Sequence, residues 1–266
     1  MSSRRTRDRQ LAKLAARRAA ERRKRRRQRI LAATVGIAFA AAGLGFGAWV
    51  LLRGGDEVSP AAGATPTPSS SSPGPQAVAC DAEVPDAASG ERPSFAQPPE
   101  MTIDPARTYT ATVKTSCGTF EMELDPSTAP NTVNSIVFLA GRGFYDGLTF
   151  HRVATGFVIQ GGDPNGDGSG GPGYQTVDPP PADTAYTKGV VAMAKGQAEA
   201  PGTAGSQFFV VTGEDSGLPA EYAVVGRVKS GLDVVERIGN LPIQAGATDG
   251  PPVDSVYIES LAIRGT

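Results

Sequence analysis

One short series of residues in the second half of the chain could bind and polarise an amide or carbonyl group. The series contains Phe150, His151, Arg152, Phe157 and Gln160, followed downstream by Gln207, Phe208 and Phe209. Arg152 carries up to five N–H donors in a fixed plane and keeps its positive charge at physiological pH. Each aromatic residue alone would be assigned to core packing, and Arg152 alone to the surface. Their occurrence together in one series is what makes them a candidate site.

The composition limits what other chemistry such a site could perform. A single histidine excludes a three-histidine metal centre, and two cysteines exclude a four-cysteine zinc site. His151 could still belong to a Ser-His-Asp arrangement, which no spacing argument excludes, but the G-x-S-x-G sequence of a nucleophile elbow does not accompany it. We therefore expect neither a metal nor a cofactor.

A glycine-rich loop, DPNGDGSGGPGY at residues 163–174, matches two binding motifs only in part. Asp163, Asn165 and Asp167 lie at calcium-loop offsets, but Tyr174 stands where that loop requires a bidentate Glu. The loop also has a G-x-G-x-x-G spacing, yet it does not open a helix within a βαβ unit, as a dinucleotide site requires. The sequence predicts a plain surface loop, with calcium binding as the alternative.

Short alternating segments surround these residues and must position them. In GTFEMEL, Phe120, Met122 and Leu124 alternate with glutamates, which predicts a half-buried strand. Seven other segments are further strand candidates: TYTATVKT, LTFHRV, GFVIQGG, GVVAMA, SQFFVVT, YAVVGRV and SVYIESLAIR. Residues 132–140 and 232–238 are typical of helices, the second with Ser230 as its N-terminal cap. These elements predict a mainly β domain, an eight-stranded antiparallel barrel with two capping α-helices.

Three strings around the candidate residues, YDGLTFHRVATGFVIQGGDP, GVVAMAK and GSQFFVVTG, closely resemble the cyclophilin family of peptidyl-prolyl isomerases. The resemblance runs in order over about residues 109–263. It includes FEMELDPSTAPNTVNSIVFLA, which is similar to the family's second strand and first helix. It implies that residues 108–266 form a cyclophilin-like domain that isomerises X-Pro bonds in proline-containing polypeptides.

This activity would need no nucleophile. Rotation about an X-Pro bond crosses a barrier of about 18–20 kcal/mol because amide resonance is lost in the twisted state. An apolar slot for the prolyl ring and donors that favour a pyramidal prolyl nitrogen lower that barrier. By the resemblance, Arg152 is the catalytic residue and lies near the prolyl nitrogen.

The resemblance also implies the substrate-binding residues. Phe157, Val158, Phe209 and Leu218 would form the proline pocket, Gln160 would orient Arg152 and contact the peptide together with Gln207, and Ala194 with Lys195 would form a ledge for the chain, with His151 and Tyr222 at the border.

Several positions depart from the family pattern. Lys195 stands where many members have Asn, Gly217 where some have Trp and Tyr222 where some have His, and the loop at 196–204 is a few residues long. Gly217 puts high-affinity binding of cyclosporin in doubt. We expect these changes to alter specificity more than activity.

The N-terminal region has the organisation of a membrane anchor. Residues 1–29 carry 14 Lys or Arg against two acidic residues, and residues 30–52 are free of charge. At about 1.5 Å per residue, 23 helical residues span roughly 34 Å, enough to cross a bilayer core. The positive-inside rule then places the basic arm in the cytoplasm. A cleavable signal peptide, cut near Ala62-Gly63-Ala64, is the alternative, but its apolar stretch would be much shorter.

Beyond the predicted single transmembrane helix, residues 53–79 are rich in Pro, Ser and Gly and predict a disordered tether, and residues 80–107 an extended pre-domain segment. Cys80 and Cys117 would lie outside the membrane, where thiols are not kept reduced, so we expect them to form a disulfide. Two unrelated thiols or a lipidated Cys80 are the alternatives.

The sequence thus predicts a single-pass protein of a bacterial plasma membrane with an extracytoplasmic isomerase domain acting on exported or membrane proteins. A proline-peptide receptor or chaperone with negligible turnover on the same fold is the second hypothesis. Nucleic-acid binding through the basic arm is the third, and the apolar segment beside that arm argues against it.

Overall fold

The computed structural model describes residues 77–265. The predicted basic arm, the predicted transmembrane helix and the tether up to residue 76 lie outside the described residues. Between residues 77 and 265, no helix is both long and apolar enough to span a bilayer.

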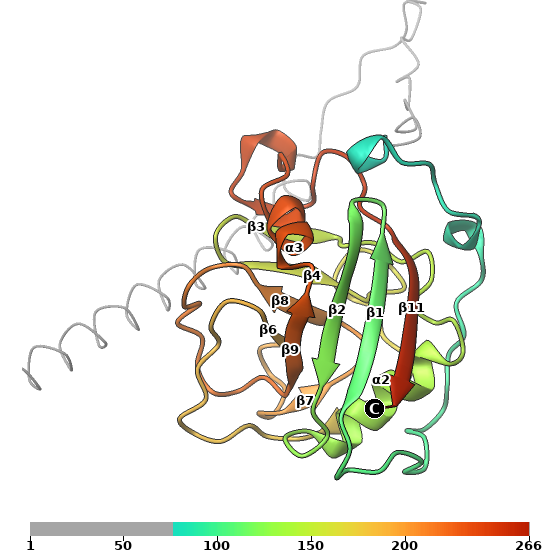
Figure 1. Ribbon diagram of the computed structural model, residues 1–266, viewed down its shortest axis with the longest axis vertical. Coiled ribbons are helices and arrows are strands. Elements are labelled where there is room, and N and C mark those ends of the chain that lie inside the picture. The colour runs from blue at the N-terminus through green and yellow to red at the C-terminus, as the bar shows by residue number, and fades with distance from the viewer. Residues whose placement is uncertain (1–76, 266) are drawn as a thin grey trace, which may run out of the picture. The chain divides into compact units, whose positions relative to one another are not determined.

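A strongly curled antiparallel sheet forms the body of the domain (Figure 1). Its strands, in spatial order, are β10 (Asp249–Gly250), β3 (Arg152–Ala154), β4 (Val158–Gly161), β8 (Phe208–Val211), β6 (Val190–Met193), β9 (Val224–Ser230), β2 (Gly118–Leu124), β1 (Tyr109–Thr115) and β11 (Ile258–Gly265). A separate pair joins β5 (Thr176–Val177) to β7 (Thr203–Ala204).

The sheet curls far enough for its two ends to meet just before β3. There the Phe150 amide donates to the Val256 carbonyl at 2.8 Å, and the Ile258 amide donates to the Leu148 carbonyl at 2.7 Å. These bonds join the segment that leads into β3 to the start of β11, so the barrel is nearly closed.

The sheet has nine strands within residues 77–265, and the predicted number of eight was wrong. All eight predicted segments form strands. The ninth, β10, is a two-residue strand in a loop of Gly and Pro, which has no alternating apolar residues by which it could be detected. It pairs with β3, with Asp249 opposite Ala154.

Two α-helices pack against the sheet. Helix α2 (Pro130–Ala140) is capped from a distance by buried Asp178, whose carboxylate accepts bonds from the Thr132 amide at 2.7 Å and the Thr132 hydroxyl at 2.6 Å. Helix α3 (Leu232–Gly239) begins after Gly231, which has a φ of 75°. The prediction that Ser230 caps this helix was wrong, because its hydroxyl instead donates to Glu121 at 3.2 Å.

Strands β6 and β8 are buried on both faces, unlike the half-buried strand that alternation predicts for β2. Val191 and Val210 belong to the main core inside the curled sheet. Ala192, Phe209 and Val211 belong to a second, smaller apolar cluster on the opposite face. Burial on both sides explains why VVAM and FFVV are continuous apolar runs.

The segment that precedes the domain is ordered along its surface, and we call residues 77–107 the strap. It includes two 3-10 turns, Ala79–Asp81 and Asp86–Ser89, and is drawn in cyan in Figure 1. Its first residues pair with Ser255, whose carbonyl accepts from the Ala79 amide at 3.0 Å. The predicted disulfide is confirmed: Cys80 is bonded to Cys117, in the turn between β1 and β2.

Candidate active site

The candidate catalytic residues lie in one row across the sheet. On neighbouring strands Arg152 pairs with Gln160, Gln160 with Phe209, and Phe209 with Ala192. Directly paired residues project from the same face, and adjacent strands are about 4.8 Å apart. Arg152 and the aromatic ring of Phe209 are therefore about two strand widths apart on one surface, with the Gln160 amide between them.

The Arg152 guanidinium is held on two sides. Its Nε and Nη2 groups donate to the two carboxylate oxygens of Asp249, both at 2.7 Å. Its Nη1 group donates to Gln160 Oε1 at 3.0 Å. These bonds use three of the five N–H donors and leave two, one on Nη1 and one on Nη2, for a substrate.

A chain of amides continues from this arginine into the glycine-rich loop. Gln160 Nε2 donates to Gln207 Oε1 at 3.0 Å. Gln207 Nε2 in turn donates to the carbonyls of Gly168 and Gly170, at 3.0 and 2.9 Å. The network fixes which end of each side-chain amide is the donor, so both glutamines have defined orientations.

The loop at 163–174 is built as a surface loop, as predicted. The carboxylate of buried Asp163 accepts bonds from the loop's own amides at Asn165, Asp167 and Gly168. These N–H groups surround the carboxylate with positive dipole ends. A cation would need the same oxygens, so the arrangement does not support the calcium alternative.

The residues predicted to form the slot for the prolyl ring meet in the second apolar cluster. Val158 and Phe209 are buried in it, and Phe157, Ala194, Leu218 and Tyr222 are partly buried against it. Tyr222 packs edge-on against Phe209 with 5.5 Å between ring centroids. The Tyr186 hydroxyl fixes the backbone of Tyr222, because it donates to the Tyr222 carbonyl at 2.8 Å and accepts from the Tyr222 amide at 2.9 Å.

Lys195 lies beside the slot with its charge already satisfied. Its side chain is only 3% exposed, and its Nζ lies 3.4 Å from a Glu221 carboxylate oxygen. The same amine donates to the carbonyl of Glu199 at 3.1 Å and lies 5.6 Å from the centre of the Tyr222 ring. Lys195 therefore anchors the start of the 196–204 loop.

His151 is adjacent to Arg152 in sequence but makes no hydrogen bond through its ring. Both ring nitrogens are buried, and among the described residues neither has a hydrogen-bond partner. Burial lowers the pKa of His151, and the nearby Asp163 charge opposes this effect. The side chain is neutral at pH 7 and borders the site without donating to Arg152.

Gly217 leaves open space at the rim, since a Cβ built there meets no heavy atom within 4 Å. The expectation about cyclosporin stays a prediction.

Asp249 is the residue that sequence reasoning missed. It faces the catalytic row because β10 pairs with β3 and sets Asp249 opposite Ala154, two residues beyond Arg152 on the same face. Neither its spacing nor its neighbours, Thr248 and Gly250, marks it in the sequence.

Comparison with known proteins agrees with this geometry. The family model described as cyclophilin type peptidyl-prolyl cis-trans isomerase/CLD matches residues 110–263. A relative in Mycobacterium leprae, named probable peptidyl-prolyl cis-trans isomerase B, is 38% identical over 180 residues, covering 62% of this chain and 59% of the relative. Peptidyl-prolyl cis-trans isomerase A of Mycobacterium tuberculosis is 39% identical over 181 residues, covering 61% of this chain and 96% of that protein.

Solved structures give the same result. The crystal structure of a cyclophilin type peptidyl-prolyl cis-trans isomerase from Cryptosporidium parvum matches with a TM-score of 0.54 and 29% identity, over 60% of this chain and 99% of that one. Another crystal structure of that protein was determined in the presence of the dipeptide Ala-Pro. The chain spans 57–59% of the length of the first Mycobacterium relatives that it matches. The family match, which covers more than half of the sequence, shows that the chain belongs to the cyclophilin-type peptidyl-prolyl cis-trans isomerase family.

Proposed function

We propose that this protein is a peptidyl-prolyl cis-trans isomerase. The observation that carries the proposal is the row across β3, β4 and β8, which presents an oriented arginine with two unused donors beside an apolar slot floored by Val158 and Phe209. Such a site can bind a prolyl ring and hydrogen-bond the adjoining amide at the same time.

In the proposed mechanism the apolar slot and Arg152 have separate tasks. The slot takes the prolyl ring out of water, and its rim of Phe157, Leu218 and Tyr222 holds the ring while the preceding carbonyl rotates. The donors of Arg152 bind the prolyl nitrogen best when its lone pair is no longer conjugated with the carbonyl, which is the condition of the twisted state. Binding that is stronger in the twisted state than in either planar isomer lowers the barrier.

We further propose that the domain acts on polypeptides outside the plasma membrane. The apolar segment at 30–52, its basic flank and the tether support a single-pass anchor with the domain outside. The disulfide between Cys80 and Cys117 supports an oxidising compartment. Protease protection of the tagged C-terminus in spheroplasts and in inverted vesicles tests the orientation: protection only in inverted vesicles is expected, and protection only in spheroplasts would overturn it.

The isomerase activity is tested with the full-length chain in detergent solution, on short X-Pro peptides and on a protein whose refolding is limited by proline isomerisation. Arg152→Ala should lower kcat/KM on the order of 100-fold, as loss of a preorganised donor does in other enzymes. Arg264→Ala, which removes an exposed arginine on β11, is the matched control and should retain activity. A folded wild-type protein that binds proline peptides but does not accelerate isomerisation would instead support the receptor hypothesis.

A further inference from the structure

The carboxylate that holds Arg152 is presented by a loop that is closed on itself. We call residues 242–253 the β10 loop, and its base is closed by the Val253 amide, which donates to the Pro242 carbonyl at 2.8 Å. The Asp249 side chain near the tip of the loop is 50% exposed, so packing does little to fix it. The place of this carboxylate therefore depends on what holds the two ends of the base.

The two ends of the base are held by different parts of the molecule. On one side the chain continues from α3, and Ile243 is buried in the main core. On the other side it continues into Ser255, which is bonded to the start of the strap. The Ser255 amide donates to the Ala77 carbonyl at 2.8 Å, and the Ser255 carbonyl accepts from the Ala79 amide at 3.0 Å. Residues 77–79 thus hold the end of the loop that follows Asp249.

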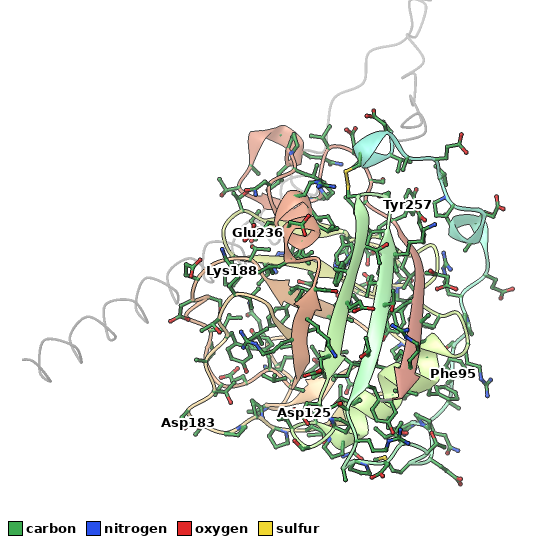
Figure 2. All side chains as sticks on the ribbon, viewed as in Figure 1. Phe95, Asp125, Asp183, Lys188, Glu236 and Tyr257 are labelled. Atoms are coloured by element: carbon green, nitrogen blue, oxygen red, sulfur yellow. A yellow bond between two sulfur atoms is a disulfide. The ribbon has the colours of Figure 1, made fainter. Side chains whose placement is uncertain are left out.

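The strap residues extend the seam at which the curled sheet closes. Val78 pairs in parallel with Ser255, and Tyr257, which Figure 2 labels, pairs with Thr149 in the antiparallel sense. The backbone groups of Ser255 are bonded to the strap, whereas those on the opposite edge of the same segment are bonded to the residues that lead into β3. The segment 255–257 therefore lies between the strap and the strand that carries Arg152.

The disulfide locks this end of the strap. Cys80 directly follows Ala79 and is bonded to Cys117, which is 3% exposed and belongs to the same core as Ala79. Cys80 has a φ of 64°, a left-handed conformation that residues other than glycine rarely adopt. Opening the disulfide releases Cys80 from this conformation and loosens the two bonds that the preceding residues make to Ser255.

We propose that residues 77–80 are a positioning segment for Arg152, which they orient through Ser255 and Asp249, and that the Cys80–Cys117 disulfide locks this segment in place. Turnover is then fastest when the disulfide is closed. The segment precedes residues 110–263, which the family model matches, so it is an addition to the matched domain. The proposal rests on the proposed isomerase function and adds a structural condition for it.

Reduction of the disulfide in the folded, full-length protein tests the proposal. A water-soluble trialkylphosphine can reach Cys80, which is exposed, and the chain has no cysteines besides this pair. The two sulfurs become thiols, and the phosphine is oxidised to its oxide with an oxygen atom from water. On an all-Ala proline peptide, kcat should fall about threefold with KM unchanged, a smaller loss than in Asp249→Asn because the carboxylate is loosened but kept.

Three variants identify the route of the effect. Cys80→Ser/Cys117→Ser should have the kcat of the reduced wild type and should not respond to the phosphine. In Asp249→Asn, reduction should lower kcat no further, because the group through which the strap acts has been removed. Leu139→Ala is the control for lost stability, since it removes core contacts of α2 and should leave kcat unchanged. Circular dichroism confirms that each protein is folded at the assay temperature.

The orientation of Arg152 is also measured without any turnover. Its Nε–H group donates to Asp249 at 2.7 Å, which shields this proton from exchange with water. In nuclear magnetic resonance spectra the signal is assigned by its loss in Arg152→Ala. Reduction should make the exchange of this proton with solvent severalfold faster, because the bond to Asp249 opens more often.

The positioning role and the isomerase function fail separately. If wild type isomerises the peptide but reduction leaves either its kcat or the Nε–H exchange rate unchanged, the positioning role is overturned and the isomerase function stands. The same holds if reduction lowers kcat equally in Asp249→Asn, or if Leu139→Ala lowers kcat as much as reduction does. If wild type does not isomerise the peptide, the isomerase function is overturned. The exchange rate then decides alone: faster exchange on reduction supports the positioning role, and an unchanged rate overturns it.

Discussion

Replacing Asp249 with asparagine tests whether the carboxylate on β10 orients Arg152, the proposed catalytic residue. The aspartate accepts from both Nε and Nη2 of Arg152, whereas an asparagine can accept one of these bonds and turns its own N–H donors toward the other. The guanidinium should then rotate, and its two free donors should no longer be fixed beside the slot.

The size of the effect follows from the exposure of the pair. A charge-assisted hydrogen bond contributes about 1.5–3 kcal/mol when it is shielded. The side chains of Arg152 and Asp249 are 35% and 50% exposed, so solvent reduces the loss to about 1 kcal/mol. We therefore predict that Asp249→Asn lowers kcat about fivefold with little change in KM.

The assay is steady-state prolyl isomerisation on an all-Ala proline peptide, with thermal unfolding recorded alongside. Asp254→Asn is the matched control, since it removes the same charge from an exposed position five residues further along. Asp249→Ala should reduce kcat further than Asp249→Asn. The reasoning is refuted if kcat of Asp249→Asn equals that of Asp254→Asn, or if the decrease lies entirely in KM.

Three further predictions concern stability. Replacing both Cys80 and Cys117 with serine should cost about 3–4 kcal/mol of unfolding free energy, because the disulfide closes a loop with a sequence separation of 37, and urea titration measures the loss. An unchanged urea midpoint of unfolding would contradict this prediction. Asp178→Ala should cost about 1–3 kcal/mol, since it leaves the buried amide of Thr132 without its acceptor and leaves the Thr132 hydroxyl only Thr176 as a partner, whereas Asp183→Ala, an exposed position, should cost little. The pKa of His151 is lowered in the folded state, so the folded protein binds fewer protons than the unfolded chain. The contribution of His151 to the free energy of unfolding is therefore complete above about pH 6.5, and it is lost as the pH falls toward the pKa of the folded state. This pH dependence should disappear in His151→Phe, and its persistence there would assign the effect to another group.

The sequence predicted the elements whose side chains alternate or repeat, because burial of one face leaves that pattern. The alternation of Phe120, Met122 and Leu124 located β2, and seven other short runs located every other strand of the main sheet except β10. The family resemblance supplied the row of Arg152, Gln160 and Phe209, which strand register then brought onto one face.

Features that depend on contacts between distant segments could not be predicted. Asp249 reaches Arg152 across 97 residues of sequence through a strand too short to show a pattern. Asp178 caps α2 although it lies 46 residues beyond Thr132 in the sequence. Capping rules consider only the residue directly before a helix, so they could not identify it. Gly231, and not Ser230, precedes α3, and this position requires glycine because a Cβ there would lie 2.6 Å from the Thr119 carbonyl oxygen, a contact that appears only after the strands pair.

The strap shows the same limit. Residues 80–107 were expected to be an extended segment, and their actual path follows from the packing of Phe95 on Phe138 and from the hydrogen bond between the Phe95 amide and the Pro172 carbonyl. A Pro-rich sequence carries no information about which groove it will border.

The most direct test of the central claim is nuclear magnetic resonance exchange spectroscopy on a proline peptide with a substoichiometric amount of the full-length protein. This measurement detects interconversion of cis and trans signals without any coupled reaction. Wild type should produce exchange cross-peaks between the two isomers, and Arg152→Ala should weaken them on the order of 100-fold while the peptide signals still shift on binding to the slot. Cross-peaks of undiminished intensity with Arg152→Ala, or none with wild type, would contradict the assignment of Arg152 as the catalytic residue of an isomerase.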